Sequence, residues 1–195
     1  MTQVSIRHGL AREHRTAAAG LYWQAFGGKL GRVMGPEPRA LGFIADVIDP
    51  SHALSALDGN GALVGVVGFR THRGSFVGGS WSDLRNHYGR SGGLWRGACL
   101  HLLAHDLPAG GMMVDGIAVR PELRGAGIGR ALIEALSHEA RRRGYAALCL
   151  DVIDENLRAR ALYQRLGFEV TGRRTSRLTR LVFDFRSVQL MRRAL

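Results

Sequence analysis

The sequence has few cysteines and no long run of apolar residues. Its two cysteines, Cys99 and Cys149, form neither a Cys-x-x-Cys motif nor a set of pairs, which favours a reducing compartment over a disulfide framework. No apolar stretch approaches the roughly 20 residues that a membrane-spanning helix needs. The first residues, MTQVSIRHGLAREHR, lack the apolar centre of a signal peptide. We therefore expect a cytoplasmic protein with no membrane partner.

Lysine is almost absent as well, since Lys29 is the single lysine among 27 basic residues. The formal net charge is nevertheless +11, which would suit a nucleic-acid partner. The arginines are spread over the whole chain, and no nucleic-acid-binding motif accompanies them. We therefore do not expect nucleic acid to be bound, whereas an anionic cofactor is favoured by the positive charge.

The periodicity of apolar residues predicts one α/β domain (an α+β mixed sheet) over residues 1–195, without repeats or linkers. Strands are predicted at residues 4–8, 52–57, 62–69, 112–119, 146–153, 168–174 and 181–191. Helices are predicted at residues 13–26, 36–47, 128–143 and 156–166, the first of them ended by Gly27, Gly28 and Gly31. The order is β-α-α-β-β-insertion-β-α-β-α-β-β, which implies a mixed sheet with helices on both faces.

The predicted insertion covers residues 71–111. Its apolar side chains recur at helical spacing, namely Leu94, Trp95, Ala98, Cys99, Leu102, Leu103 and Leu107. We interpret the segment as carrying one amphipathic helix that packs back onto the domain. His101 and His105 stand four residues apart in it, but no HExxH glutamate accompanies them, so we expect no metal.

The strongest chemical signal is a glycine-rich turn between a strand and a helix, Arg124-Gly125-Ala126-Gly127-Ile128-Gly129. Glycines at the start of a helix let the backbone approach a ligand closely, and the unpaired N–H groups there suit a pyrophosphate. Arg124 and Arg130 add positive charge. The GxGxG spacing differs from the GxGxxG of dinucleotide-binding folds, and a P-loop would need Gly-Lys-Ser/Thr, so neither of those sites is expected.

These residues resemble the cofactor motif of the GNAT superfamily of acetyl-CoA-dependent N-acetyltransferases. That motif is a strand, then Arg or Gln, two residues and Gly-x-Gly/Ala before a helix, and it is met by Arg124, Gly127 and Gly129. A second motif of the family is matched by Leu150-Asp151-Val152, Asn156, Ala159, Tyr163 and Leu166-Gly167-Phe168. The resemblance is specific over residues 114–168 and implies a GNAT-like acyl-CoA N-acyltransferase fold with acetyl-CoA as co-substrate.

The resemblance also assigns roles to individual residues. Acetyl-CoA is expected to bind along Ile117, Ala118 and Val119, at Asn156, and on the turn formed by Arg124, Gly125, Ala126, Gly127, Ile128, Gly129 and Arg130. A strand N–H is expected to polarise the acetyl carbonyl. Tyr163 is expected to protonate the departing sulfur as general acid, since a phenol with a pKa near 10 can donate a proton there. The alternative for Tyr163 is a helix aromatic that packs on the sheet.

The acceptor amine must lose a proton too, and uncharging a lysine-like amine at pH 7 costs about 4–5 kcal/mol. Asp151 is the candidate general base, because several relatives resembling this chain carry glutamate there. Strand alternation gives it the face of Ala147 and Cys149. Asp115 on the adjacent strand is the rival base, and a salt-bridging or capping role is the alternative for both.

The sequence therefore predicts an N-acetyltransferase that moves the acetyl group directly to a primary amine of a small molecule or of a protein or peptide. The alternatives are a non-catalytic acetyl-CoA-binding module that regulates a partner, and a basic nucleic-acid-associated protein on the same fold. Asn156 and Tyr163 favour the enzyme, because a binding module has little use for an acid at the sulfur. The assembly state is open, with a homodimer among the options.

Overall fold

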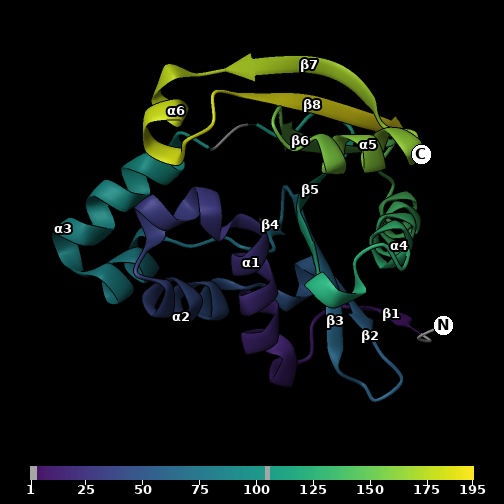
Figure 1. Ribbon diagram of the computed structural model, residues 1–195, viewed down its shortest axis with the longest axis horizontal. Coiled ribbons are helices and arrows are strands. Elements are labelled where there is room, and N and C mark those ends of the chain that lie inside the picture. The colour runs from purple at the N-terminus through teal and green to yellow at the C-terminus, as the bar shows by residue number, and fades with distance from the viewer. Residues whose placement is uncertain (1–3, 104–105) are drawn as a thin grey trace.

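The computed structural model describes residues 4–103 and 106–195, and a mixed β-sheet runs through its centre (Figure 1). The strands lie in the order β1-β2-β3-β5-β6-β8-β7, with a short β4 against β3. Their bounds are β1 (Ser5–His8), β2 (Ala53–Leu57), β3 (Leu63–Thr71), β4 (Gly74–Ser75), β5 (Gly111–Val119), β6 (Ala147–Ile153), β7 (Glu169–Thr175) and β8 (Ser187–Ala194). Of these strands, β5 and β6 form the parallel pair. The predicted mixed α/β fold is confirmed.

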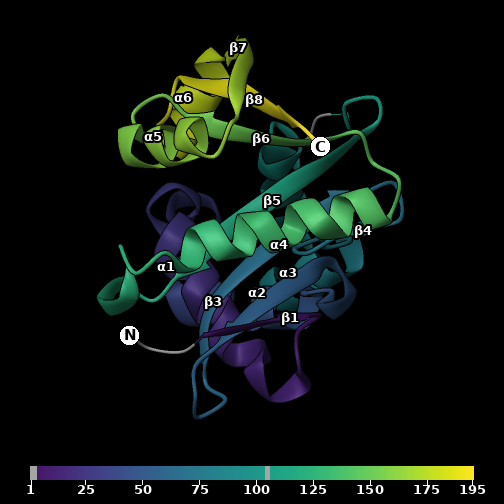
Figure 2. The same cartoon turned by 90° about the vertical axis from the view of Figure 1, so that its right-hand side faces the viewer.

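Helices cover both faces of the sheet, as Figures 1 and 2 show. One face carries α1 (Arg15–Met34), α2 (Glu37–Val47), α3 (Trp81–His101) and α6 (Arg177–Phe183), and the other carries α4 (Ile128–Arg142) and α5 (Leu157–Arg165). Short 3₁₀ helices span Arg12–His14, Pro50–His52 and Pro121–Leu123. Along β6, Leu148 and Leu150 point into the core beneath α4 and α5, whereas Cys149 points to the opposite face. The predicted alternation of this strand is therefore confirmed.

The first helix is longer than the sequence predicts. The predicted end at the glycines of residues 27–31 is wrong, because α1 continues to Met34 and ends at Gly35. A glycine costs about 1 kcal/mol in a helix interior. Val33 and Met34 in the last turn are only 1% and 3% exposed, and burying such side chains contributes about 1.5–3 kcal/mol each. Core packing thus outweighs the low helix propensity of the glycines.

The insertion is helical, but the prediction of a single helix is wrong, because α3 consists of two helical segments that meet at Gly89. It also starts earlier than predicted, and its inward face differs. Ser80 and Asp83 form a capping box at its start, and Gly89 kinks the helix with φ 75° and ψ 176°. Leu94 and Trp95, predicted to face inward, are 66% and 44% exposed. Glycines, rather than these apolar side chains, pack the helical segment after the kink against the segment before it. Gly93 lies so close to the backbone of residues 84–85 that a Cβ added at this glycine would be 3.0 Å from backbone atoms there.

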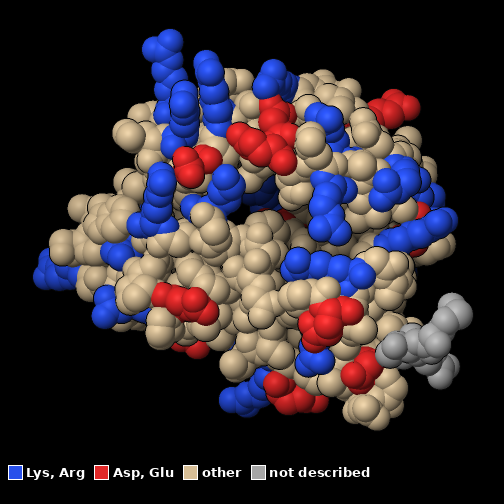
Figure 3. Space-filling view, viewed as in Figure 1, with Lys and Arg blue, Asp and Glu red and all other residues tan. Residues whose placement is uncertain are grey.

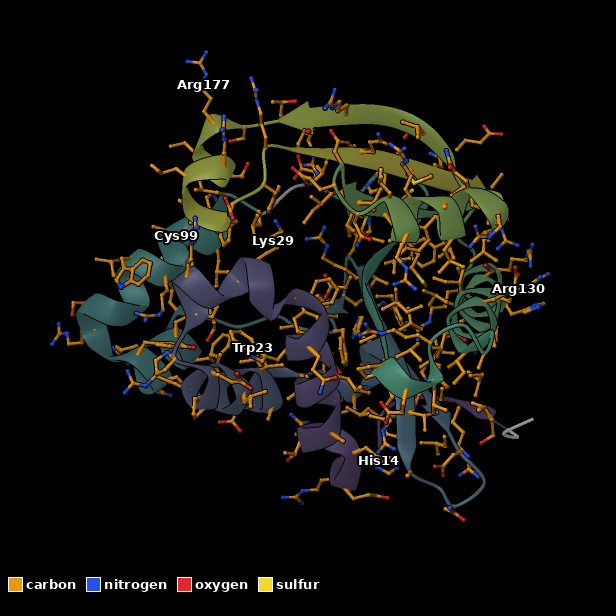
Figure 4. All side chains as sticks on the ribbon, in the orientation of Figure 1. His14, Trp23, Lys29, Cys99, Arg130 and Arg177 are labelled. Carbon is orange, nitrogen blue, oxygen red and sulfur yellow. The ribbon has the colours of Figure 1, made fainter. Side chains whose placement is uncertain are left out.

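The C-terminal segment also departs from the two strands predicted for it. The strand predicted at residues 181–191 is wrong in its first part, because α6 occupies residues 177–183 and β8 begins at Ser187. Ser176 caps α6 by accepting a hydrogen bond from the Thr179 N–H (3.3 Å), and Phe183 in its last turn is fully buried. Four arginines of this segment therefore lie on two different elements, Arg173 and Arg174 on β7, and Arg177 (Figure 4) and Arg180 on α6.

Candidate active site

β5 and β6 separate part-way along their length. They pair in parallel over residues 111–113 and 147–149, after which β5 stays with β3 and β6 stays with β8. Figure 2 shows the two strands diverging beyond this pairing. The edge of β5 over residues 114–119 therefore turns backbone N–H and C=O groups toward a gap, where an extended ligand can pair with them.

The glycine-rich turn leads from β5 into α4 beside this gap. Gly125 and Gly127 have φ of +89° and +83°, and a Cβ added at either would meet nothing within 4 Å. Gly127 is the N-cap of α4, and no side chain of the described residues caps it. The N–H groups of residues 128–130 have no intrahelical acceptor, because the first such bond runs from the Ala131 N–H to the Gly127 carbonyl. The turn is therefore an open site for an anion.

The turn, β5 and α5 converge at Gly129. A Cβ added there would lie 3.8 Å from both Ile117 of β5 and Leu162 of α5. Arg124 donates a hydrogen bond from Nε to the Val119 carbonyl (3.3 Å), and Arg130 extends from α4 at the rim of the molecule in Figure 4. The residues predicted to hold the cofactor on these three elements are thus neighbours.

Tyr163 lies on α5 with its ring edge-on to Phe168, at a centroid distance of 5.7 Å. The residue is 8% exposed and belongs to the core beneath α4 and α5. Burial raises the pKa of Tyr163 to about 12, so its phenol stays protonated at neutral pH. Tyr163 therefore packs against the core and also has a phenol proton that it could donate.

Asn156 begins α5 as its N-cap. Its Oδ1 accepts a hydrogen bond from the Ala159 N–H (3.2 Å), and the residue is exposed. The side-chain NH₂ group cannot take part in this cap, because a cap requires an acceptor. Asn156 can therefore both stabilise the helix start and donate to a ligand.

Asp115 sits at a β-bulge in β5. The register between β3 and β5 shifts between Gly68 and Phe69, which makes Asp115 the extra residue of its strand, and a bulge redirects the side chain. Asp115 Oδ2 accepts a hydrogen bond from the Val77 N–H (3.2 Å). Burial and, second to it, the charge of Asp115 raise the pKa of Tyr22 on α1. The carboxylate thus lies on the α1 side of the sheet.

The two candidate bases border different cavities. Asp115 borders a cavity of about 570 Å³ between α1, α2, α3 and the sheet, which we call the Asp115 cavity. Asp151 accepts a hydrogen bond from Arg174 of β7 and borders cavities of about 460 and 300 Å³ beside β7 and β8. Figure 3 shows the surface hollowed between the part formed by β6, β7 and β8 and the part formed by α1 and α2.

Sequence reasoning missed the residues that enclose the Asp115 cavity. They include Tyr22 of α1, Phe43 of α2, Arg70 of β3 and Trp81 of α3. These residues are far apart in the chain, and no motif connects them. Trp81 and Gly97 meet only because the two segments of α3 pack together, where a Cβ at Gly97 would lie 2.2 Å from the Trp81 ring.

In the described part of the chain, the surroundings of Cys149 and of the potential metal ligands do not favour the chemical roles considered for them. Burial raises the pKa of the Cys149 thiol, which disfavours the thiolate that a nucleophile needs. Within residues 4–103 and 106–195 no group of three or more His, Cys, Asp or Glu is arranged to hold a metal, and His105 lies outside the described residues. None of the described helices has the length and apolarity to cross a membrane.

Comparison with known proteins decides the family. The model of the "Acetyltransferase (GNAT) family" matches residues 16–168, which include the gap between β5 and β6, the glycine-rich turn and α5. The chain belongs to this GNAT family. A curated relative, the [ribosomal protein bS18]-alanine N-acetyltransferase of Escherichia coli K12, is 51% identical over 59 residues. That match covers 30% of this GNAT chain and 40% of the relative.

Solved structures share the fold across nearly the whole GNAT chain. A GCN5-related N-acetyltransferase from Kribbella flavida is 18% identical, with a TM-score of 0.62 over 98% of both chains. The ribosomal-protein-S18-alanine N-acetyltransferase from Escherichia coli is 19% identical, with a TM-score of 0.58 over 98% of this chain and 94% of that one. At these identities the likeness confirms the GNAT fold alone.

Proposed function

We propose that this protein transfers the acetyl group of acetyl-CoA directly to a primary amine. The observation that carries the proposal is the gap between β5 and β6, which lies beside the open glycine-rich turn. A free strand edge suits the amides of an extended pantetheine arm, and the start of α4 suits a pyrophosphate. Acetyl-CoA would supply an activated acyl group and a thiol leaving group.

The residues that would hold acetyl-CoA come from three adjacent elements. Backbone groups of Ile117, Ala118 and Val119 would pair with the pantetheine arm, and one of these N–H groups would polarise the acetyl carbonyl. The turn from Arg124 to Arg130 would bind the pyrophosphate through residues 128–130. The convergence of β5, α4 and α5 at Gly129 supports this assignment, because it brings the pantetheine and pyrophosphate sites together.

Asn156 would donate a hydrogen bond to the pantetheine from its side-chain NH₂ group. Asn156→Ser keeps an efficient N-cap but removes that donor, so we expect unchanged thermal stability and acetyl-CoA affinity lowered by about 3–10-fold. Asn156→Ala should lose the same affinity and, in addition, about 0.5–2 kcal/mol of stability. Calorimetry and thermal unfolding of both variants separate the two roles. Full affinity in the Ser variant would leave Asn156 as a cap only.

Tyr163 would stabilise and protonate the departing sulfur. With a pKa of about 12 it is fully protonated at neutral pH. Donating to a thiolate whose ordinary pKa is about 8.5 would cost about 5 kcal/mol, at about 1.4 kcal/mol per pKa unit. The cost falls when the sulfur is buried beside the phenol, since burial raises the pKa of a thiol as well. Tyr163 would therefore act through a hydrogen bond that becomes a proton transfer as the sulfur departs.

The geometry of Asp115 supports this residue rather than Asp151 as the base that takes the amine proton. The bulge in β5 directs the Asp115 carboxylate to the α1 side of the sheet, where it borders the cavity of about 570 Å³ between α1, α2, α3 and the sheet. This order is the reverse of the one suggested by the sequence.

Matched variants and a pH–rate profile test the choice of base. At pH 7 we expect Asp115→Asn to lower kcat/KM by about 10²–10⁴-fold, because a charged amine must then lose its proton without help. Part of this loss should be recovered above the pKa of the amine, where neutral amine is abundant. Asp151→Asn should lower kcat/KM by less than about 10-fold at every pH. A larger, pH-recoverable loss in Asp151→Asn would return the role to that residue.

The proposed reaction is tested by thiol release from acetyl-CoA across a library of primary amines that includes peptide N-termini. We expect thiol release that depends on the amine, with acetylated amine identified by mass spectrometry. Binding of acetyl-CoA without release in the presence of any amine would contradict transfer and favour a regulatory binding module.

A further inference from the structure

His52 is a buried histidine to which the proposed reaction gives no role. It ends the 3₁₀ helix before β2, and only 5% of the residue is exposed. Its Nδ1 lies 2.7 Å from Asp49 Oδ2, and its Nε2 lies 3.1 Å from Thr71 Oγ1 at the end of β3. Because an ionised carboxylate only accepts, Nδ1 donates to Asp49, and in the neutral ring Nε2 then accepts from the Thr71 hydroxyl. The ring therefore ties two distant segments of the chain together.

The same ring fixes the turn that leads from β3 to β4 (Figure 1). Thr71 Oγ1 accepts a further hydrogen bond there, from the Arg73 N–H (3.2 Å). Gly74 at the start of β4 lies so close to His52 that an added Cβ would be 2.9 Å from the ring. The turn therefore packs directly on the imidazole, and loss of the ring's hydrogen bonds would loosen it.

The turn leads on to a segment that contacts the Asp115 carboxylate. The Asp49 N–H donates a hydrogen bond to the Phe76 carbonyl (2.9 Å), and Ile48 forms an antiparallel bridge with Val77. Phe76 is only 1% exposed, so its side chain anchors the segment in the core. The Val77 N–H donates to Asp115 Oδ2 (3.2 Å). The segment is therefore held in place where it meets the carboxylate.

We propose that His52 is a positioning residue for acetyl transfer, acting through residues 71–77 on the carboxylate of Asp115. With both of its ring nitrogens bound, the turn and the segment after it hold the Val77 N–H in place, and that N–H orients the carboxylate. Displacing a catalytic group by about 1 Å can lower a rate by about 10²-fold, so a contact at a distance can control turnover. This inference rests on the proposed function, in which Asp115 takes the amine proton.

Two variants break the same hydrogen bond from opposite sides. Thr71→Val removes the hydroxyl and keeps a β-branched side chain, whereas His52→Asn has a side chain too short to reach Thr71. We expect either variant to lower kcat/KM for thiol release by about 10-fold at pH 7, with the most rapidly acetylated amine of the library. Affinity for acetyl-CoA should not change. His8→Gln is the matched control, since His8 also pairs with a carboxylate, that of Glu139 (3.2 Å), but lies on β1.

A double-mutant cycle with Asp115→Asn separates positioning from a purely structural role. This variant retains an oxygen that accepts the Val77 N–H, but it cannot take a proton from the amine. In the Asp115→Asn background we expect Thr71→Val to lower kcat/KM further by less than about 2-fold. The loss caused by Thr71→Val alone should be recovered above the pKa of the amine, where no base is needed. An equal loss in both backgrounds would overturn the inference.

Hydrogen exchange tests the contact without turnover. We expect the Val77 amide to exchange at least about 10-fold faster in Thr71→Val and in His52→Asn than in the parent protein, while the amides of β6 keep their rates. Unchanged exchange at Val77 would overturn the inference, as would thiol release that neither variant lowers. If the parent protein releases no thiol, faster exchange at Val77 would still support the contact, whereas acetyl transfer, and with it the role of His52, would be contradicted.

Discussion

Replacing Gly127 by valine is expected to weaken acetyl-CoA binding by about 10²-fold or more. Gly127 has φ +83°, a conformation that a β-branched residue adopts only with strain, so the start of α4 should shift. The space around its missing Cβ is open, and in our proposal that space admits the pyrophosphate. The valine side chain would therefore both distort and obstruct the anion site. Calorimetry with acetyl-CoA measures the effect.

Gly61→Val provides the matched control. Gly61 has φ +81° and also has nothing within 4 Å of an added Cβ, but it lies in the turn between β2 and β3. The two variants should lose comparable stability in thermal unfolding, whereas Gly61→Val should bind acetyl-CoA as the parent does. Undiminished affinity in Gly127→Val, or an equal loss in both variants, would contradict the assignment of the turn.

Tyr163→Phe is expected to lower turnover by about 10²–10⁴-fold while acetyl-CoA still binds, the size of effect that loss of a general acid produces. The substitution removes one hydroxyl and leaves the contact with Phe168, so the core beneath α5 should remain packed. Single-turnover measurement of thiol release isolates the chemical step from product release.

Tyr145→Phe is the control for this prediction, since Tyr145 packs against the same hydrophobic cluster outside the site. It should leave turnover unchanged. A chemical step of unchanged rate in Tyr163→Phe would assign the residue to packing alone. Because burial raises the pKa of Tyr163 to about 12, the parent enzyme should show no loss of activity from ionisation of this phenol up to about pH 11.

The turn and helix that we propose for the cofactor could be predicted because the information for their geometry is local. The glycines of residues 125–129 act through backbone conformation and through the helix they begin, and both follow from adjacent residues. Asn156 and Tyr163 lie at the start and near the end of one helical segment, and the structure has them there. A pattern within a single strand–turn–helix unit is therefore visible without knowledge of the rest of the chain.

The side of the site that we propose for the acceptor could not be predicted, because it depends on contacts between distant segments. The direction of Asp115 follows from a bulge, and strand alternation alone cannot show where a bulge falls. The ion pair of Asp151 joins residues 23 apart in sequence, from β6 to β7. Trp81 and Phe43 meet one cavity only because α3 packs against α2.

The errors in the fold have the same origin. Local propensity ends α1 at its glycines, but burial of Val33 and Met34 extends it. The apolar residues near residue 181 suggested a strand, whereas burial of Phe183 and the cap at Ser176 stabilise α6. In each segment, tertiary packing decided between structures that the local pattern alone could not distinguish.

The most direct test of acetyl transfer is the initial rate of thiol release with acetyl-CoA and a primary amine varied together. Direct transfer requires both substrates to be bound at once, so the double-reciprocal lines should intersect, and the intact protein should carry no acetyl group. Parallel lines together with an acetylated protein would indicate a covalent intermediate and contradict direct transfer. Rates that no primary amine increases would contradict acetyl transfer itself.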